Sequence, residues 1–559
     1  MTRMSGKQAL IEQLLADGAR YVFGNPGTTE QGFMDALQDY PQLEFILALH
    51  EGVAVGVADA YARATRKPAF VELHIAPGLG NAMGMLYDAA RGHSPLVVYA
   101  GQSDTHSLDQ EPLLSGDLVR MAEPLCKWAV EAKHAHDVPM LLRRAMKVAA
   151  GPPPGPVFMS LPLDVLDQAA DMHITPTSYV AGRIRPDAET LRAAAALLAG
   201  ARHPAIVVGD GVAISGAQAE VGAMADLIGA PIQAGYASET NLPAGHPLAG
   251  NPLNVVSGAA VRASLDASDV ILIIGTPVWR TIFPAESGPL PDEARVIQID
   301  QDTWELAKNA PVEFALHADP KTTLEELIPL VEALMSPEQR ESARARAAAY
   351  SERRTAAEHR LRAEDDKRRD QSPIAVTRLM QEIAAALPSS AAIFDESVTS
   401  GGALQRYFRL EPGAYFRARG GGLGPGMPGT VGLKLAYPDR AVVGVVADGS
   451  AMYTITALWT AAHHKLPVTW VIVNNSSYRI LKLNLQDYLG EAGAHRRFMH
   501  TDLEDPPIRY DRLAESMGVW GRRVERTEDL GDALREAMAV PGPSLLDVVV
   551  DPAVPGRAR

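Results

Sequence analysis

Short apolar runs rich in β-branched residues recur along the whole chain, and segments rich in alanine and leucine lie between them. Strands that alternate with helices pair in parallel, because a helix supplies the crossover that returns the chain to the same edge of the sheet. The chain has 559 residues, which is too many for one hydrophobic core. We therefore expect several α/β domains, each with helices packed on a mainly parallel sheet.

The predicted strands fall into three groups. Residues 1–170 contain YVFGNPG, PAFVELH, PLVVYAG and GPVFMSLP; residues 186–335 contain PAIVVGDGV, GAPIQAG, DVILIIGTPV and ARVIQIDQD; residues 372–559 contain SAAIFDES, AVVGVVADGS, VTWVIVNN and SLLDVVVDP. The polar stretch 167–186 predicts a linker. Residues 336–371 are strongly charged and rich in helix formers, so they predict an exposed helix joining two domains. The expected fold class is three consecutive doubly wound α/β domains with mainly parallel sheets.

Composition argues against several classes of protein. The net charge of -15 argues against a broad nucleic-acid-binding surface. No apolar run is long enough to span a bilayer, and the N-terminus resembles an amphipathic helix starting near Ser5 rather than a signal peptide. Cys126 is the only cysteine, so no intrachain disulfide or cysteine-based zinc site can form. We expect a cytoplasmic protein that binds neither nucleic acid nor membrane.

Two polar residues end successive predicted strands in the third group. The pattern predicts a strand over Ala441–Asp448, a helix over Ala451–His464 and a second strand over Val468–Asn475. Such a βαβ unit places two parallel strands side by side or nearly so. Asp448 and Asn475 are therefore expected at the carboxyl edge of the sheet, where open α/β sheets bind ligands.

The residue types at this edge suit a metal-bridged diphosphate. A carboxylate and an amide oxygen are hard ligands of the kind Mg²⁺ prefers, with phosphate oxygens and water completing the octahedron. Gly449 and Ser450 open the following helix, so their N–H groups can face an anion. The alternative is structural: Asp448 as a helix cap and the Asn-Asn pair around Asn475 as an ordinary turn.

Several segments, in order, resemble the thiamin diphosphate (ThDP)-dependent 2-oxo acid decarboxylase and acetolactate synthase superfamily. They are FGNPGTTE, ILALHEGVAVGVADAYARAT, ELHIAPGLGNAMGML, GGGLGPGMPGTVGLKLA and the metal motif ADG…NN, in which Ala447 replaces a usual glycine. Within it, the likeness is greatest to the benzoylformate decarboxylases. The resemblance implies that Asp448, Asn475 and the Ser477 carbonyl bind Mg²⁺, which Ca²⁺ can replace, and that the three groups are pyrimidine-binding, central and diphosphate-binding domains.

The resemblance also implies a catalytic glutamate and an apolar wedge. Glu51 would hydrogen-bond the cofactor's pyrimidine and promote the imino tautomer that takes the C2 proton. Its alternative role is a helix N-terminal glutamate stabilised by the dipole. Leu423, beside Gly422, would bend the cofactor so that its reactive nitrogen meets C2, and the flanking glycines allow close approach. The alternative for Leu423 is a loop leucine anchored in the core.

Two further residues match active-site positions of the benzoylformate decarboxylases. His74 follows a predicted strand and would orient a substrate carboxylate or shuttle protons. Thr28 stands at the position of an active-site serine and would hydrogen-bond a substrate carboxylate or carbonyl. A structural histidine and a turn or capping hydroxyl are the respective alternatives.

One departure from that pattern affects the expected substrate. Where the benzoylformate decarboxylases have a second active-site histidine, the resemblance places Ile282, so a proton-transfer group is missing. The other expected pocket residues are apolar: Leu113, Leu114, Val398 and Ile480. Four arginines near the same loops would either meet an anionic substrate group or lie at the surface or an interface: Arg280, Arg417, Arg419 and Arg479.

The expected function is ThDP- and Mg²⁺-dependent decarboxylation of a 2-oxo acid, with carboligation to an aldehyde acceptor. Two alternatives stay open: a dedicated carboligase similar to acetolactate synthase, favoured by loss of the second histidine, and a catalytically silent ThDP-binding homologue. The resemblance implies an active site between two subunits, so a homodimer is the minimum and a homotetramer is expected. The segment VVGDGVAISGAQ lacks GxGxxG spacing, so FAD is not expected.

Overall fold

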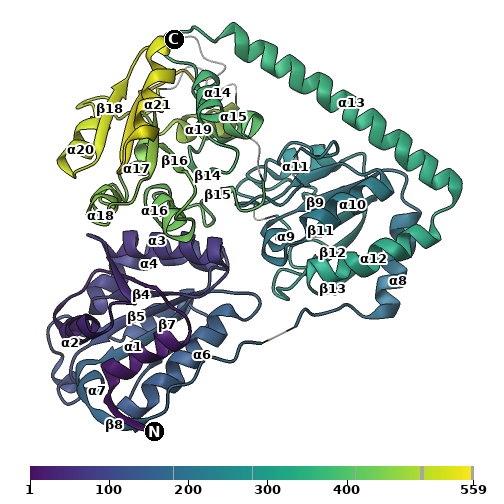
Figure 1. Cartoon of the computed structure of the whole chain (residues 1–559). Helices are drawn as coiled ribbons and strands as arrows, with labels where there is room; N and C mark the ends of the chain where they lie inside the picture. The colour runs from purple at the N-terminus through teal and green to yellow at the C-terminus, as the bar shows by residue number, and fades with distance from the viewer. Residues whose placement is uncertain (181, 244, 280, 409–410, 491–496, 555–559) are drawn as a thin grey trace. The chain divides into compact units, whose positions relative to one another are not determined.

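The computed structural model describes the whole chain except residues 181, 244, 280, 409–410, 491–496 and 555–559 (Figure 1). The chain divides into two compact units. The first comprises Met1–Val180, Arg368–Phe408 and Arg417–Arg559, and the second comprises Ala181–Lys367 and Arg409–Phe416. Among the described residues, each end of the chain forms a six-stranded sheet, and the central segment forms a five-stranded sheet.

The N-terminal sheet has the strand order β3-β2-β4-β5-β7-β6, with every neighbouring pair parallel. Its strands are β2 (Tyr21–Gly24), β3 (Glu44–Leu47), β4 (Ala69–Leu73), β5 (Leu96–Gln102), β6 (Ala129–Glu131) and β7 (Val157–Pro162). The four strands predicted here are confirmed. The edge strands β3 and β6 were not predicted, because they are short and each has a charged end.

Helices cover both faces of this sheet (Figure 1). Helix α1 (Gly6–Ala16) begins where predicted, since Ser5 caps it and forms a capping box with Gln8. It packs with α6 (Val138–Ala150), and together they bury one apolar face of the sheet. Helices α3 (Glu51–Thr65) and α4 (Ile75–Arg91) cover the opposite face.

The segment predicted as a linker after this domain contains a strand. Strand β8 (Ala169–Met172) pairs antiparallel with β1 (Thr2–Ser5), which ties the polar stretch back to the N-terminus. Long-range pairing of two short polar segments leaves no signal in local hydrophobic periodicity, so the linker prediction was wrong over these four residues.

The C-terminal sheet has the order β15-β14-β16-β17-β19-β18. Its strands are β14 (Ala392–Glu396), β15 (Tyr415–Arg417), β16 (Val442–Ala447), β17 (Thr469–Asn474), β18 (Trp520–Val524) and β19 (Ser544–Val549). The pairs from β14 to β18 are parallel, and the four predicted strands are confirmed. Because β16 and β17 are direct neighbours, their carboxyl ends share one edge, as the sequence predicted.

Helix α16 (Gly426–Ala436) of this domain packs closely against α3 of the N-terminal domain. A Cβ atom at Gly432 would lie 2.2 Å from the carbonyl oxygen of Val57, and one at Gly56 would lie 2.6 Å from the Pro428 ring. Only glycine allows this approach of two backbones. The contact joins the two sheets of the first unit through a buried helix pair.

The single helix predicted over Ala451–His464 is wrong. The segment forms α17 (Asp448–Ala451) and α18 (Ala457–His463), with turns between them. The Thr454 hydroxyl donates to the Gly424 carbonyl, so it draws the interrupted backbone toward another loop. This tertiary hydrogen bond overrides the local helical pattern, and the β-branched residues around it favour the interruption.

The second unit contains a parallel sheet of order β10-β9-β11-β12-β13. Its strands are β9 (Pro204–Val208), β10 (Ile232–Ala234), β11 (Val270–Ile274), β12 (Arg295–Asp300) and β13 (Phe314–His317), and its helices include α8 (Ala188–Ala199), α10 (Gln218–Ile228) and α12 (Pro320–Leu334). The charged segment forms α13 (Pro337–Lys367), as predicted, with Ala343 as its one buried residue. Among the described helices, none combines the length and apolar character needed to cross a bilayer.

Candidate active site

Asp448 and Asn475 lie at the carboxyl ends of the neighbouring strands β16 and β17, with exposures of 2% and 5%. One oxygen of each accepts the same donor, the backbone N–H of Ser477. The distance to this nitrogen is 3.3 Å from Asp448 Oδ2 and 3.1 Å from Asn475 Oδ1. The two hard oxygens therefore converge in a buried site, and this donor set fits a small divalent cation.

The carboxyl group of Asp448 is buried from solvent and accepts several backbone hydrogen bonds. Burial raises the pKa of Asp448 to about 6, and backbone N–H donors of Gly449 and Ser477 oppose that rise. The Tyr510 hydroxyl donates to the Asp448 carbonyl at 2.8 Å. A Cβ atom at Gly449 would lie 2.5 Å from the Tyr478 ring, so only glycine fits this turn. A bound cation would stabilise the carboxylate form.

The glycine-rich loop that carries Leu423 is held by a buried carboxyl group from β14. Glu396 Oε1 accepts the N–H of Gly424, and Oε2 accepts the N–H of Gly426, each at 2.6 Å. Burial raises the pKa of Glu396 to about 8, which these backbone donors and the Ser450 hydroxyl oppose. Ser450 is thus directed toward Glu396. The hydrogen bonds from Gly424 and Gly426 to Glu396 also fix the loop conformation at Gly424, where φ is +111°.

A second carboxyl group holds the same loop from the N-terminal domain. Asp88 Oδ1, on α4, accepts the Gly422 N–H at 3.1 Å. Burial raises the pKa of Asp88 to about 6. Leu423 is half-buried between the two anchored glycines, Gly422 and Gly424. The position of Leu423 is therefore set by hydrogen bonds that both domains make to its neighbours.

Sequence reasoning missed both carboxyl groups. Glu396 carried the signal used for Asp448, namely an acidic residue at the end of a β-branched strand, in SAAIFDES. Asp88 lies inside α4 and nothing in its local sequence distinguishes it from a surface residue.

Glu51 is the first residue of α3 and is 8% exposed. Asn81 Nδ2, on α4, donates to Glu51 Oε2 at 3.1 Å. A Cβ atom at Gly78 would lie 3.2 Å from Glu51 Oε1, so α4 approaches the carboxylate closely. His50 caps the helix through its Nδ1, which accepts the Gly52 N–H at 3.0 Å. The cap and Asn81 together fix where this carboxylate points.

His74 lies between β4 and α4, as the N-cap residue of the helix, and pairs with a buried glutamate. Its Nδ1 lies 2.8 Å from Glu30 Oε2, and Glu30 has no exposed surface. A carboxylate partner keeps the proton on Nδ1 and leaves Nε2 as the free ring nitrogen. The Thr29 hydroxyl donates to the other Glu30 oxygen at 2.6 Å and lies 3.4 Å from His74 Nδ1.

Thr28, the residue selected from the sequence, is exposed, and among the described residues no hydrogen bond to its side chain occurs. Its neighbours Thr29 and Glu30 are the ones that contact His74. The rotation of the short helix over Thr28–Glu30 decides which side chain points inward, and the sequence does not show that rotation.

A third buried glutamate lies behind this pair. Neither oxygen of Glu72, on β4, has a hydrogen-bond partner among the described residues. Burial and the nearby charges of Glu30 and Glu51 raise its pKa well above the usual range for a carboxyl group. Burial without a hydrogen-bond partner in the described part of the chain therefore favours the neutral form of Glu72.

The expected pocket residues have different environments. Leu113 is 86% exposed, and Leu114 is 38% exposed with φ of +69°. Val398, with φ of +50°, lies on the loop after β14, and Ile480 is the second residue of α19 (Arg479–Leu489); both are half-buried. Ile282 belongs to the second unit and is 67% exposed.

The four arginines selected from the sequence also differ in their burial and partners. Arg419 is 3% exposed, and Arg417 Nε lies 3.8 Å from Asp395 Oδ2. Arg479 is half-buried and donates hydrogen bonds to hydroxyl groups after β14. Arg280 lies outside the described residues.

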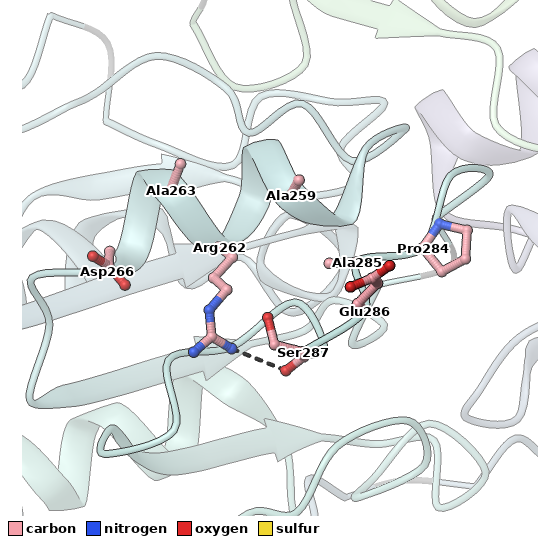
Figure 2. A pocket seen from close by; sticks show the side chains of 8 residues that line it. All are labelled: Ala259, Arg262, Ala263, Asp266, Pro284, Ala285, Glu286 and Ser287. Carbon is pink, nitrogen blue, oxygen red and sulfur yellow. Dashed lines mark hydrogen bonds between the residues drawn. The ribbon is translucent and has the colours of Figure 1, made fainter. Parts of the chain in front are cut away.

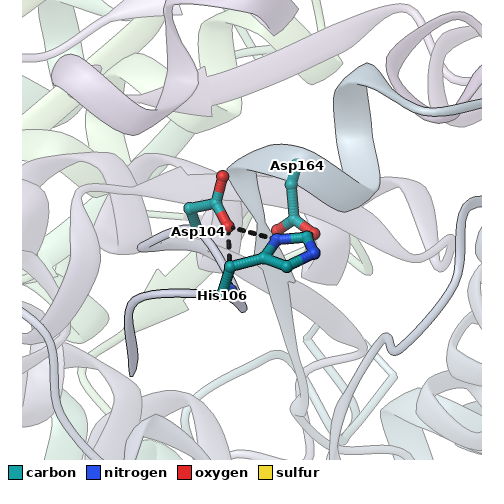
Figure 3. Close-up of side chains that lie close together, drawn as sticks. All are labelled: Asp104, His106 and Asp164. Atoms are coloured by element: carbon teal, nitrogen blue, oxygen red, sulfur yellow. Dashed lines mark hydrogen bonds and ion pairs between the residues drawn. The ribbon is translucent and has the colours of Figure 1, made fainter. Parts of the chain in front are cut away.

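Two other clusters have fewer features of a site. A cavity of about 550 Å³ in the second unit is lined by α11 (Gly258–Leu265) and residues 284–287 (Figure 2), and the Arg262 guanidinium there is occupied by the carbonyls of Ser287 and Leu290. Asp104 and His106, after β5, lie close to Asp164 of α7 (Leu163–Asp167) (Figure 3), but His106 is bonded to Asp104, and Asp164 accepts two hydrogen bonds from Thr105.

Comparison with known proteins agrees with this arrangement. Three models of thiamine pyrophosphate enzymes match: the N-terminal binding domain over residues 4–121, the central domain over 191–327 and the C-terminal binding domain over 398–548. The chain therefore belongs to the thiamine pyrophosphate enzyme family.

Individual relatives cover almost the whole chain. Benzoylformate decarboxylase from Pseudomonas aeruginosa is 34% identical over 97% of this chain and 98% of that protein. The large subunit of acetolactate synthase isozyme 3 from Escherichia coli is 26% identical over 96% of this chain and 93% of that protein. The structure of a 4-hydroxybenzoylformate decarboxylase from Rhodococcus jostii superposes with a TM-score of 0.84 at 30% identity, over 98% and 99% of the two chains.

Proposed function

We propose that this protein decarboxylates a 2-oxo acid with the help of thiamin diphosphate and Mg²⁺. The observation that carries the proposal is the convergence of Asp448 and Asn475 oxygens on the Ser477 amide at one sheet edge. Family membership supports the cofactor, and similarity to two decarboxylases of aryl 2-oxo acids supports the reaction.

The residues at the sheet edge fit a metal-bridged diphosphate. Asp448 and Asn475 would bind the cation through oxygen, together with the Ser477 carbonyl that the family motif implies. Gly449 keeps the turn free of side-chain bulk at its contact with Tyr478. Leu423 would support the middle of the cofactor, on a loop that Glu396 and Asp88 hold in place.

The N-terminal domain supplies the acid–base groups. Bound thiamin diphosphate supplies a nucleophilic carbon and an electron sink for loss of the carboxylate. Glu51 would share a proton with the pyrimidine ring, and Asn81 holds that carboxylate in one orientation. His74 would donate and accept a proton at Nε2, because Glu30 holds the tautomer that leaves this nitrogen free. The apolar side chains Val398 and Ile480 would limit water at the reacting carbon.

A panel of 2-oxo acids, assayed by CO₂ release with and without thiamin diphosphate and Mg²⁺, tests the reaction. We expect turnover of at least one aryl or branched substrate, and its loss after chelation with EDTA. Calorimetry should show cofactor binding only when the metal is present. A protein that binds no thiamin diphosphate would contradict the proposal and favour a silent homologue.

We also propose that two subunits complete each active site, in a homodimer or a tetramer of two such dimers. Complementation tests this: Glu51→Gln and Asp448→Asn homodimers should each be inactive. Suppose that each site takes Glu51 from one chain and Asp448 from the other. A dimer with one chain of each variant then has one intact site out of two. Random mixing makes about half of all dimers of this mixed kind, so up to about a quarter of wild-type activity should return. If mixing restored no activity, both residues would act in a site formed by the same chain.

A carboligase is the second candidate, because Ile282 stands where the resemblance expects a proton-transferring histidine. An apolar side chain there would slow protonation of the intermediate and leave time for a second carbonyl compound to react. Product analysis with pyruvate or benzoylformate and an added aldehyde separates the two. Free aldehyde as the sole product would exclude the carboligase.

A further inference from the structure

Arg479 is a half-buried cation with only neutral partners. It begins α19 (Arg479–Leu489), two residues after Ser477. Its Nε and Nη2 donate to the Thr399 hydroxyl at 3.0 and 2.8 Å, and Nη2 also donates to the Ser400 hydroxyl at 3.1 Å. Its Nη1 lies 3.5 Å from the Asp551 carbonyl oxygen.

No carboxylate neutralises this guanidinium. Within the described parts of the chain, no carboxylate oxygen lies within 4.0 Å of an Arg479 nitrogen. The two acidic groups whose charge reaches it are Asp448 and Asp551. The Asp448 carboxylate accepts backbone amides at the proposed metal site, and Asp551 Oδ2 is bonded to Arg368 and Gln371. Burial of a charge without a partner is costly, so this arrangement indicates a missing anion.

The position of the guanidinium shows which anion fits. Thr399 and Ser400 follow β14, Asp448 follows β16 and Arg479 follows β17, and these three strands are adjacent and parallel. Arg479 therefore lies on the carboxyl edge that carries the convergent oxygens of Asp448 and Asn475. One divalent cation, one carboxylate and one guanidinium leave two positive charges in excess there, and a diphosphate supplies matching negative charge.

We propose that Arg479 binds a phosphate oxygen of the cofactor's diphosphate, together with the hydroxyls of Thr399 and Ser400. This inference rests on the proposed function, and it adds a direct cationic contact to the metal bridge. A planar guanidinium presents several N–H donors in a fixed fork that matches a phosphate, and the hydroxyls can turn their protons toward the same oxygens. The alternative is a structural tether between the loops after β14 and β17.

Calorimetry on the full-length protein tests the contact directly. The variants are Arg479→Gln, which removes the charge, and Arg479→Lys, which keeps the charge but loses the fork. Arg526→Gln is the matched control, since Arg526 is a surface arginine paired with Asp529. The probes are thiamin diphosphate and inorganic pyrophosphate, each with Mg²⁺, and thiamin as the ligand without phosphate.

We expect Arg479→Gln to weaken thiamin diphosphate and pyrophosphate by about 10- to 100-fold, the loss typical of one hydrogen-bonded charge. The affinity of Arg479→Lys for both ligands should lie between those of the wild type and Arg479→Gln, and the affinity of Arg526→Gln should match that of the wild type. Weak binding of thiamin itself should not change. The wild type should also show a steeper loss of pyrophosphate affinity with salt than Arg479→Gln.

Unchanged pyrophosphate affinity in Arg479→Gln, with or without a lower melting temperature, would identify a tether and overturn the proposal. Should that variant fail to fold, Arg479→Lys and Thr399→Val provide the same comparison, and unchanged affinity in both would overturn it. Wild-type protein that bound pyrophosphate through Arg479 but no thiamin diphosphate would instead contradict the proposed function.

Discussion

Asn81 donates a hydrogen bond to Glu51, the carboxylate that we propose takes part in the chemistry. Glu51→Gln keeps the size of the side chain and one oxygen for Asn81, but it removes the carboxyl group that we propose shares a proton with the cofactor. We expect kcat to fall at least about 100-fold, as for loss of a general acid–base group, while thiamin diphosphate still binds. CO₂ release and calorimetry measure the two effects.

The control is Glu341→Gln, which neutralises a glutamate whose side chain is 77% exposed on α13. It should leave both kcat and cofactor affinity at wild-type values. A Glu51→Gln enzyme with normal turnover would remove Glu51 from the mechanism, whatever its burial.

Glu396 holds the glycine-rich loop that carries Leu423. In Glu396→Gln the new amide NH₂ would face one of the two backbone N–H groups that the carboxyl group now accepts. We expect a loss of stability of about 1–3 kcal/mol, the cost of an unsatisfied buried donor. Hydrogen exchange of the Gly424 and Gly426 amides in cofactor-free protein should accelerate.

The matched control is Glu536→Gln, which breaks a surface pair with Arg522. It should leave exchange in the glycine-rich loop unchanged. Equal protection of these amides in Glu396→Gln and wild type would show that other contacts, such as Asp88 with Gly422, suffice to hold the loop.

At the scale of elements, the helix pair α3 and α16 depends on glycine. A methyl group at Gly432 would lie 2.2 Å from the Val57 carbonyl oxygen, and backbone on both sides limits relief. We expect Gly432→Ala to destabilise the protein by about 1–3 kcal/mol, as overpacking does. Chemical denaturation measures this change.

Gly402→Ala is the matched control, because it lies in α15 (Gly401–Tyr407) with open space around its Cβ position. Alanine favours helix over glycine, so this variant should be neutral or up to about 1 kcal/mol more stable. Equal stability changes in the two variants would show that the close approach of α3 and α16 is not what constrains Gly432.

Several of the strands that the sequence predicted contain a long apolar run. Strands β5, β16 and β17 are almost wholly buried, so hydrophobic pattern alone locates them. The short edge strand β3 and the antiparallel β8 depend on pairing with strands elsewhere in the chain. The local hydrophobic pattern does not indicate these pairing partners.

The same distinction holds for the candidate site. The adjacency of Asp448 and Asn475 followed from a topological rule, because a βαβ unit brings two strand ends to one edge. The contacts of Thr29 and Asp88 depend on how far a helix is rotated and on which loop meets it. The broken helix after Asp448 depends on the hydrogen bond from Thr454 to Gly424, which no local propensity encodes.

At the scale of the whole first unit, one histidine links its two domains through a hydrogen bond that requires a neutral ring. His464 Nε2, after α18, accepts the Leu47 N–H of β3 at 3.0 Å. Burial and the neighbouring His463 lower the pKa of His464 to about 4. The opposing group is Glu44, whose oxygen lies 3.7 Å from Nδ1, but its side chain is 57% exposed and therefore screened by solvent.

This link predicts a defined loss of stability in acid. Above the ordinary histidine pKa of about 6.5 the ring is neutral in both folded and unfolded chains, so pH has no effect through it. As pH falls from about 6.5 toward 4, His464 binds a proton in the unfolded chain but not in the folded chain. We expect about 2–4 kcal/mol of stability to be lost over this range through His464.

Urea denaturation of the wild type and His464→Gln at pH 7.5, 6 and 5 measures the effect. Glutamine can still accept the Leu47 N–H but cannot titrate, so the stability gap between wild type and variant should narrow steadily as pH falls. His359→Gln, which removes an exposed histidine on α13, should run parallel to the wild type at every pH. If the curve for His464→Gln also stayed parallel to the wild type, protonation of His464 would not be what weakens the joint between the two domains.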